Sequence, residues 1–308
     1  MTRPARTLSI NDIAISSLSI QTSNGQTQGI QLNYDALVST LGYRMPLVKS
    51  IDIQISLLNP HTLAIDNVNS TERWLYFSDH SLGRIYRADI TSSAVALLVD
   101  HAWSIHGLAV YGSSLYISSE SNGTISLYNT LSNSSTTILS DLHSPRGLVV
   151  DRLNSTLYVV EKGGKIFMAK TTGMSFYGPS RAVYTQMHRL VGGNTLSRLN
   201  GISLSSDGYI YWSESNSNVI ARMSLTSYTR QVILGPPRAI LSWPRHVYIL
   251  ASNDGLYYTE YPGRISIMTI PTQSTTNVVN QVMLSSWSGQ MDQLLQIPSN
   301  ELLFYALE

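Results

Sequence analysis

A short aromatic segment recurs six times in this chain of 308 residues, and this repetition constrains the fold more than any other feature. Each copy has an aliphatic residue, then Tyr or Phe, then a third hydrophobic residue, and most copies end in an acid. The copies cover residues 75–79, 115–119, 157–161, 210–214, 256–260 and 303–307, with starts about 40 to 53 residues apart. Repeats of this length are typical of propeller blades that have four strands each. Six copies therefore predict an all-β fold, a six-bladed β-propeller.

An apolar strand with a common opening precedes each aromatic segment. These strands are expected at 60–66, 105–110, 145–151, 199–204, 244–249 and 292–297. A turn such as Ser206-Asp207-Gly208 separates the two strands, and turns with Asp-Gly or Asn-Gly close β-hairpins. A third strand, for example 83–90, and a weaker fourth strand, for example 94–99, follow the aromatic segment. One repeat is thus expected to be four antiparallel strands, with the apolar strand innermost.

The sixth copy has only two strands before the sequence stops at Glu308. Residues 1–50 contain two strand-like stretches of their own, at 12–20 and 28–32. We therefore expect residues 1–50 to supply the outer strands of the last blade and residues 51–308 to hold the repeats, in a single domain. This arrangement leaves no open edge between the first and the last blade. The alternative, an open β-array or a pair of sandwiches, accounts less well for six copies in phase.

The repeats resemble the class B (YWTD) repeats of the low-density-lipoprotein-receptor family and, more distantly, the NHL repeats. Residues 210–214 (Ile-Tyr-Trp-Ser-Glu) match the YWTD element, 145–151 match the strand before it and 220–225 match the strand after it. The resemblance covers residues 51–308. The threonine of the motif is preserved only at Thr259, and the acidic position slips by one residue in the second and sixth copies. Such propellers include receptors, scaffolds and enzymes, so the resemblance implies a fold and leaves the function open.

One polar position per blade, the second residue of each inner strand, is predicted to lie at one rim of the central channel. These ring residues are His61, His106, Arg146, Asn200, Arg245 and Gln293. All of them can donate hydrogen bonds and none is acidic, so together they favour a carboxylate or another anion as ligand. The other interpretation is that each side chain packs between blades and bonds carbonyl groups there. Trp103 and Trp243 precede two of the inner strands and would add aromatic contact area at the same rim.

A second series, this time of acids, follows the aromatic strands at Asp79, Glu120, Glu161, Glu214, Glu260 and Glu308. In YWTD propellers the comparable acid mainly makes hydrogen bonds between blades, so the resemblance implies a structural role. Related propeller hydrolases of the gluconolactonase type hold a catalytic calcium in the channel, and Asn200 resembles one of their ligands. The other ring positions supply no carboxylate. His106 or His143 would serve as a general base only with an acid partner nearby.

The composition narrows the range of possible functions further. Only 13% of the residues are charged and the net charge is +1, so no strong electrostatic field is expected to attract nucleic acid. No run of about 18 apolar residues is present, so no membrane span is expected. Cysteine is absent, which excludes disulfides and thiolate metal sites. Sequons begin at Asn69, Asn122, Asn133 and Asn154, a number that chance alone produces in a chain this rich in Ser and Thr.

The sequons fall in turn-like or polar segments, so we expect them to be glycosylated and the chain to be extracellular or secreted. The first residues match a signal peptide poorly. We predict a non-catalytic propeller that binds a protein or glycan partner at the channel rim or serves in assembly. No catalytic residue, metal or cofactor is predicted. The alternative is a calcium-dependent lactonase or related hydrolase with a site in the channel.

Overall fold

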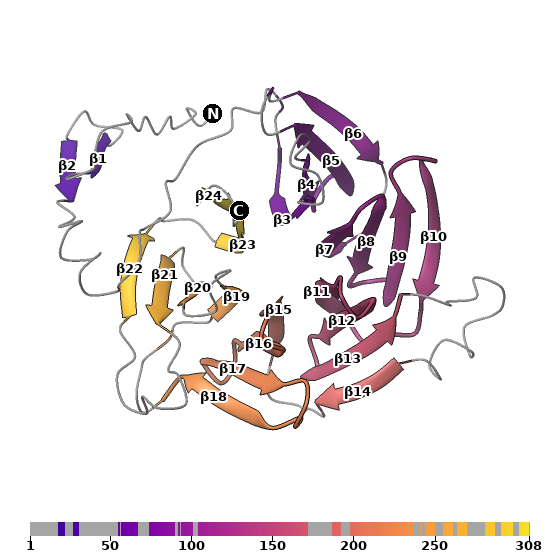
Figure 1. Cartoon of the computed structure of the whole chain (residues 1–308). Helices are drawn as coiled ribbons and strands as arrows, with labels where there is room; N and C mark the ends of the chain where they lie inside the picture. Colours follow the sequence, from indigo (N-terminus) through magenta and orange to yellow (C-terminus); the bar gives the residue numbers. More distant parts are fainter. Residues whose placement is uncertain are drawn as a thin grey trace.

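The computed structural model is all-β and describes most of the repeat region. The described residues are 18–21, 27–30, 55, 57–66, 74–89, 92, 94–100, 104–171, 187–191, 198–236, 241, 244–249, 255–260, 264–269, 281–286, 291–297 and 302–307. Among them, five antiparallel four-stranded sheets follow one another along the chain, and a two-stranded sheet comes last (Figure 1). The four-strand repeat expected from the sequence is therefore confirmed.

The strands of each blade are consecutive in the chain. The first blade is β3 (Pro60–Asp66), β4 (Trp74–Asp79), β5 (Arg84–Asp89) and β6 (Val95–Val99), and the second is β7 (Ile105–Tyr111), β8 (Ser114–Ser119), β9 (Thr124–Asn129) and β10 (Ser134–Leu139). The third is β11 (Pro145–Asp151), β12 (Thr156–Glu161), β13 (Lys165–Lys170) and β14 (Met187–Val191), and the fourth is β15 (Leu199–Leu204), β16 (Tyr209–Glu214), β17 (Val219–Ser224) and β18 (Arg230–Leu234). The fifth is β19 (Pro244–Ile249), β20 (Gly255–Glu260), β21 (Arg264–Thr269) and β22 (Gln281–Ser286), and β23 (Met291–Ile297) pairs with β24 (Leu302–Leu307).

The first strand of each blade lies innermost (Figure 1). These inner strands contact one another in the order β3, β7, β11, β15, β19 and β23, and β23 also contacts β3. At the N-terminus, β1 (Leu18–Gln21) pairs with β2 (Thr27–Ile30) in a sheet of its own. That residues 1–50 complete the last blade stays a prediction, and so does the division into residues 1–50 and 51–308.

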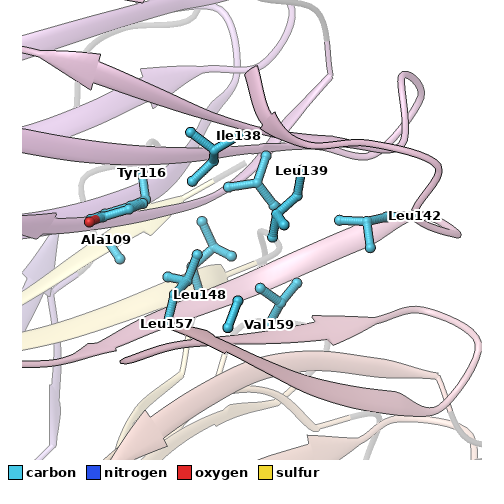
Figure 2. Packing of buried hydrophobic residues seen from close by; sticks show 10 residues of the cluster. Ala109, Tyr116, Ile138, Leu139, Leu142, Leu148, Leu157 and Val159 are labelled. Atoms are coloured by element: carbon cyan, nitrogen blue, oxygen red, sulfur yellow. The ribbon is translucent and has the colours of Figure 1, made fainter. Parts of the chain in front are cut away.

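The core consists of apolar layers between adjacent blades. One layer joins Tyr116, Ile138 and Leu139 of the second blade to Leu148 and Leu157 of the third. Figure 2 shows these side chains facing one another across the two sheets. Both faces of a second strand are covered in this way, so every residue of β12 is buried and no alternation of polar residues remains. Each large apolar side chain buried there contributes about 1.5 to 3 kcal/mol relative to an exposed one.

The recurring aromatic segment forms the second strand of each blade, and in the second and fourth blades its serine links neighbouring blades. In the fourth blade Tyr211 and Trp212 are completely buried. The Ser118 hydroxyl donates to the Arg146 carbonyl oxygen of the next blade at 2.6 Å, and Ser213 donates to the Arg245 carbonyl oxygen. The motif residues thus belong to the framework, since they pack in the core and join adjacent inner strands.

A β-bulge opens every inner strand. In each blade the first residue of the inner strand pairs with the last residue of the second strand, as Pro60 does with Asp79 and Ile105 with Ser119. The register then shifts by one residue, between Pro60 and Leu63 in β3 and at the equivalent places in β7, β11, β15, β19 and β23. Bulges bend a strand and redirect the side chain of the extra residue. In the first five blades the bulge includes the second residue of the inner strand, which is the predicted ring residue.

Glycine follows three of the ring residues, and at two of these glycines the neighbouring inner strand approaches closely. A Cβ atom on Gly107 would overlap the carbonyl oxygen of Arg146, and one on Gly147 would overlap the carbonyl oxygen of Asn200. Both carbonyl groups belong to the next blade. Any side chain at these positions would push adjacent blades apart.

We predict that Gly107→Ala destabilises the fold by about 2 to 3 kcal/mol or more, because the overlap is with backbone and cannot be relieved by a rotamer change. Gly163→Ala is the matched control, since a Cβ atom at Gly163 meets nothing within 4 Å. Urea unfolding followed by tryptophan fluorescence measures both variants. Equal midpoints for the two variants would contradict this account of blade spacing.

Candidate functional site

The ring residues come from consecutive inner strands, as the sequence predicts. His61 lies on β3, His106 on β7, Arg146 on β11, Asn200 on β15 and Arg245 on β19. His61 and Arg146 are buried, whereas the other three are half-buried. The side chains of Gln293, Trp103 and Trp243 lie outside the described residues, so their roles stay predictions. In β23 the register shifts between Met291 and Gln293, which places Asp292 in the bulge.

A second set of polar side chains lies at the same end of the blades, and sequence reasoning did not recognise it as a set. We call these the turn residues; each directly follows the second strand of its blade. They are His80, Glu120, Lys162 and Ser215. The backbone N–H of each donates to the carbonyl oxygen of the residue just before the inner strand, as Glu120 does to Ser104 at 2.9 Å. Reading the residue after the aromatic segment in every repeat would have found this set.

Glu120 lies at the centre of the site, where three basic side chains meet it. Its Oε2 atom is 2.5 Å from His106 Nε2. Arg146 Nη2 donates to both carboxylate oxygens at 3.1 Å, and Lys162 Nζ donates to Oε1 at 3.1 Å. Among the side chains that the structure describes here, one carboxylate therefore faces two permanent cations. The acid partner that His106 needed is present.

Hydrogen bonds continue from Arg146 across the next two blades. Arg146 Nη1 donates to Asn200 Oδ1, and Asn200 Nδ2 donates to the hydroxyl of Ser215. Ser215 in turn donates to the carbonyl oxygen of Pro244 at 2.6 Å. Together with the pair His61–His106, the chain of bonds runs from the first blade to the fifth. This continuity fixes the side-chain positions before any ligand arrives.

The bonds also determine the tautomers of two histidines. An ionised carboxylate only accepts, so His106 carries its proton on Nε2 and leaves a lone pair on Nδ1. His61 Nε2 is 2.7 Å from that atom and must be the donor. His80 completes a cluster of three imidazoles, with its ring centre 5.1 Å from that of His61 and 4.9 Å from that of His106. His80 is itself held by Ile105, whose carbonyl oxygen is 3.1 Å from Nδ1.

Both members of the pair His106–Glu120 have pKa values below their usual range. Burial lowers the pKa of His106 from 6.5 to about 4, helped by His61 and Arg146, although the bond to Glu120 acts in the opposite direction. For Glu120, burial alone would raise the pKa. The hydrogen bonds from His106 and Lys162 and the charge of Arg146 outweigh it and hold this pKa far below its usual value. At neutral pH the site therefore contains a carboxylate and a neutral imidazole.

Glu120 differs from Asp79, Glu161, Glu214 and Glu260 because it follows its second strand, whereas those four acids end theirs. Asp79 and Glu161 end their strands and accept backbone N–H groups of the loops that enter their own blades, Leu58 at 2.6 Å and His143 at 2.7 Å respectively. In the second blade Ser119 occupies that strand position instead. A shift of one residue moves a side chain to a different face of the backbone. Because of this one-residue shift, Glu120 belongs to the candidate site, whereas Asp79 and Glu161 have structural roles.

The donor set at this end does not match a calcium ion. Calcium takes six to eight oxygen ligands, most of them from carboxylates and carbonyl groups. Glu120 is surrounded by Arg146, Lys162 and His106, and the Asn200 side-chain oxygen already accepts from Arg146. Within the described ranges, no group of three or more His, Asp or Glu residues could hold a metal ion. The charge pattern suits an anion better than a cation.

Of the four predicted glycosylation sites, the structure describes three and Asn69 lies outside it. Asn122 lies in the turn between β8 and β9, at the end that carries the ring and turn residues. Asn133, between β9 and β10, and Asn154, between β11 and β12, lie at the opposite end. All three side chains are exposed.

Solved structures with the same fold are numerous, although the sequence itself matches no protein-family model and no curated protein. A structure of a nidogen–laminin complex matches at 19% identity over 68% of this chain and 76% of that chain, with a TM-score of 0.58. A gluconolactonase from Xanthomonas campestris matches at 14% identity over 86% of this chain and 94% of that chain, with a TM-score of 0.62. A virginiamycin B lyase from Staphylococcus aureus matches at 13% identity over 77% of this chain and 73% of that chain, with a TM-score of 0.57.

The chain has the β-propeller fold of these structures. Propellers among these neighbours include both a protein in a protein complex and enzymes, so the fold alone does not select a function. In the part of this propeller that the structure describes, no helix is long and apolar enough to span a membrane.

The propeller should lose stability in acid, and His106 should account for much of the loss. Its folded pKa of about 4 lies below the unfolded value of 6.5, so the unfolded chain binds a proton more readily. The free energy of unfolding therefore falls as the pH drops from about 6.5 to about 4, by up to about 3 kcal/mol from this residue. Glu120, whose folded pKa is also depressed, adds a loss in the same direction below about pH 4.5.

Urea unfolding between pH 4 and 8 tests this expectation. His106→Gln should flatten the dependence on pH between 6.5 and 4, because no group there titrates. His143→Gln is the control, since His143 is exposed outside the network, and it should keep the wild-type slope. Identical slopes in the two variants would show that the network does not control acid stability.

Proposed function

We propose that this propeller is a non-catalytic, extracellular binding module that contacts an acidic surface of a protein partner at the end formed by the ring and turn residues. The observation that carries the proposal is the cluster around Glu120, in which one carboxylate is shared by Arg146 and Lys162. Among the described side chains of this cluster, the cations outnumber the carboxylate, and hydrogen bonds already hold these side chains in place. A partner carboxylate would find both a cation and oriented hydrogen-bond donors there.

Lys162 is the cation that a partner would reach first. Its side chain is 45% exposed, whereas that of Arg146 is 5% exposed. Arg146 therefore contributes positive electrostatic potential and a fixed geometry from its buried position. Lys162 makes the direct contact with the partner. A long lysine side chain normally loses rotamer freedom on binding. Its bond to Glu120 has already restricted it, which lowers the cost of forming the contact.

The electrostatics of the site support binding rather than acid–base catalysis. A general base works best when its pKa is close to the working pH. The pKa of about 4 makes His106 a weak proton acceptor at neutral pH. The structure of the nidogen–laminin complex adds support, because a propeller of this fold takes part in a protein–protein complex there.

The charge of Lys162 provides the test. Titration calorimetry with a hexaglutamate peptide should detect binding that weakens with added salt, and hexaglutamine should not bind. Lys162→Gln should lower the affinity for hexaglutamate about three- to fivefold, the range of a partly exposed ion pair. Arg152→Gln removes the same charge from a turn at the opposite end and should leave the affinity unchanged.

Two results would refute the proposal. One is equal loss of affinity in the two variants, since the effect would then reflect net charge and not a site. The other is the absence of hexaglutamate binding at low salt.

The second candidate function is hydrolysis of an ester or lactone, and the pair His106–Glu120 is the observation that favours it. A carboxylate that holds Nε2–H orients an imidazole as the acid of a catalytic triad does. His106 Nδ1 would then take a proton from water, after displacement of the bond from His61. Among the structural neighbours is a gluconolactonase.

A pH-stat assay with simple lactones and esters decides whether this candidate stands. Turnover should disappear in His106→Gln and persist in His143→Gln. Hydrolysis no faster than in buffer, or hydrolysis that survives loss of His106, would remove the candidate.

A further inference from the structure

We propose that Asn133 carries an N-linked glycan and that its first sugar covers the side chain of Leu131. This inference concerns the end of the propeller opposite the proposed binding site, and it shares with the proposed function only the extracellular location. It accounts for a leucine that is 83% exposed at the tip of a turn. Leu131 and Leu153 are the most exposed large hydrophobic residues in the described part of the chain.

The turn that presents Leu131 is held in one conformation. Asn129 ends β9, and its Oδ1 atom accepts the backbone N–H groups of Leu131 at 2.9 Å and Ser132 at 3.1 Å. Asn133 has a φ of 52°, a left-handed conformation that asparagine tolerates better than most residues. The ends of such a four-residue turn lie within about 7 Å of each other. Leu131 and Asn133 thus belong to one tight turn, which places Leu131 within reach of a sugar attached to Asn133.

The amide of Asn133 is oriented so that its nitrogen is available. The buried Tyr128 donates its hydroxyl proton to Asn133 Oδ1 at 3.1 Å. The Nδ2 atom consequently points away from that bond, on a side chain that is exposed. Ser134 and Ser135, which complete the sequon, are exposed as well. The bond from Tyr128 would persist in a glycosylated asparagine, because the amide oxygen is not altered.

Attachment would follow the usual chemistry of the sequon. Asn133 Nδ2 forms a bond to the anomeric carbon of a sugar in a lipid-linked oligosaccharide donor. The bond between that carbon and the pyrophosphate of the donor breaks, the lipid pyrophosphate leaves, and Nδ2 loses one proton. One face of a pyranose ring consists mainly of C–H groups. Packing this face on Leu131 removes apolar surface from water, whereas the hydroxyl groups stay solvated.

The turn at 152–155, at the same end of the propeller, contains a sequon that is unsuited to glycosylation. Asn154 Nδ2 already donates to Asp151 Oδ2 at 2.7 Å, so its nitrogen is directed toward the protein. Thr156, the last residue of that sequon, is buried and bonded to Lys170 and to the carbonyl oxygen of Asn154. Leu153 is 90% exposed beside it. Leu153 thus serves as a matched control. It is a similarly exposed leucine next to a sequon whose asparagine nitrogen is already hydrogen-bonded.

The first experiment asks which asparagine is modified. The full chain, fused to a secretion signal, is expressed in a glycosylating cell, and intact masses are measured. Asn133→Gln and Ser135→Ala should each lose the mass of one glycan, whereas Asn154→Gln should keep the same glycan mass as the wild type. Unmodified Asn133 in the secreted wild-type protein would overturn the proposal. Because the cell supplies the compartment, this result does not depend on where the protein resides naturally.

The second experiment asks what the glycan covers. Ser135→Ala removes the sequon but keeps Asn133 and its bond to Tyr128. Binding of an apolar fluorescent dye should rise at least twofold in Ser135→Ala relative to the glycosylated protein. The rise should vanish when Leu131→Ser is added and remain when Leu153→Ser is added. A rise that is the same with or without Leu131 would overturn the covering role, and loss of acidic-peptide binding in Lys162→Gln would not affect either result.

Discussion

The bulge at the start of each inner strand is the constraint on which both the framework and the candidate site depend. It inserts one extra residue opposite the end of the second strand, as between Pro60 and Leu63. The extra residue bends the strand, so its side chain leaves the ladder and joins the ring residues. The ring residues also offer backbone carbonyl groups to the preceding blade, as Arg146 does to Ser118 and Gly107. Spacing of the blades and placement of polar side chains are thus two results of one backbone feature.

The polar network is built from residues that would be costly to bury singly. Arg146 is buried, yet Glu120 and Asn200 accept from its guanidinium group, which offsets the loss of hydration. His106 stays neutral because burial disfavours its charged form. The result is a cluster with a small net charge and few degrees of freedom. Such a cluster suits recognition, since its geometry is established before a partner binds.

The two ends of the propeller differ in chemistry for reasons that lie in the connections. At one end, turns join the second strand to the third and carry His80, Glu120 and Lys162 beside the ring residues. At the other end, turns such as 130–133 and 152–155 are stabilised by a preceding Asn or Asp side chain and present exposed leucines. Loops tolerate change without loss of the core, so each end is free to acquire its own surface.

The repeat in the sequence determined the architecture, because six aromatic segments in phase admit few folds and blades of four strands follow from their spacing. It also placed the described ring residues on inner strands, because one position per repeat becomes one position per blade. The sequence did not determine which side chains bond. Glu120 is 26 residues from Arg146 and 42 from Lys162, and His61 is 45 from His106. Those contacts cross between blades, and only the tertiary structure, through the bulges and the one-residue slip at Glu120, brings them together.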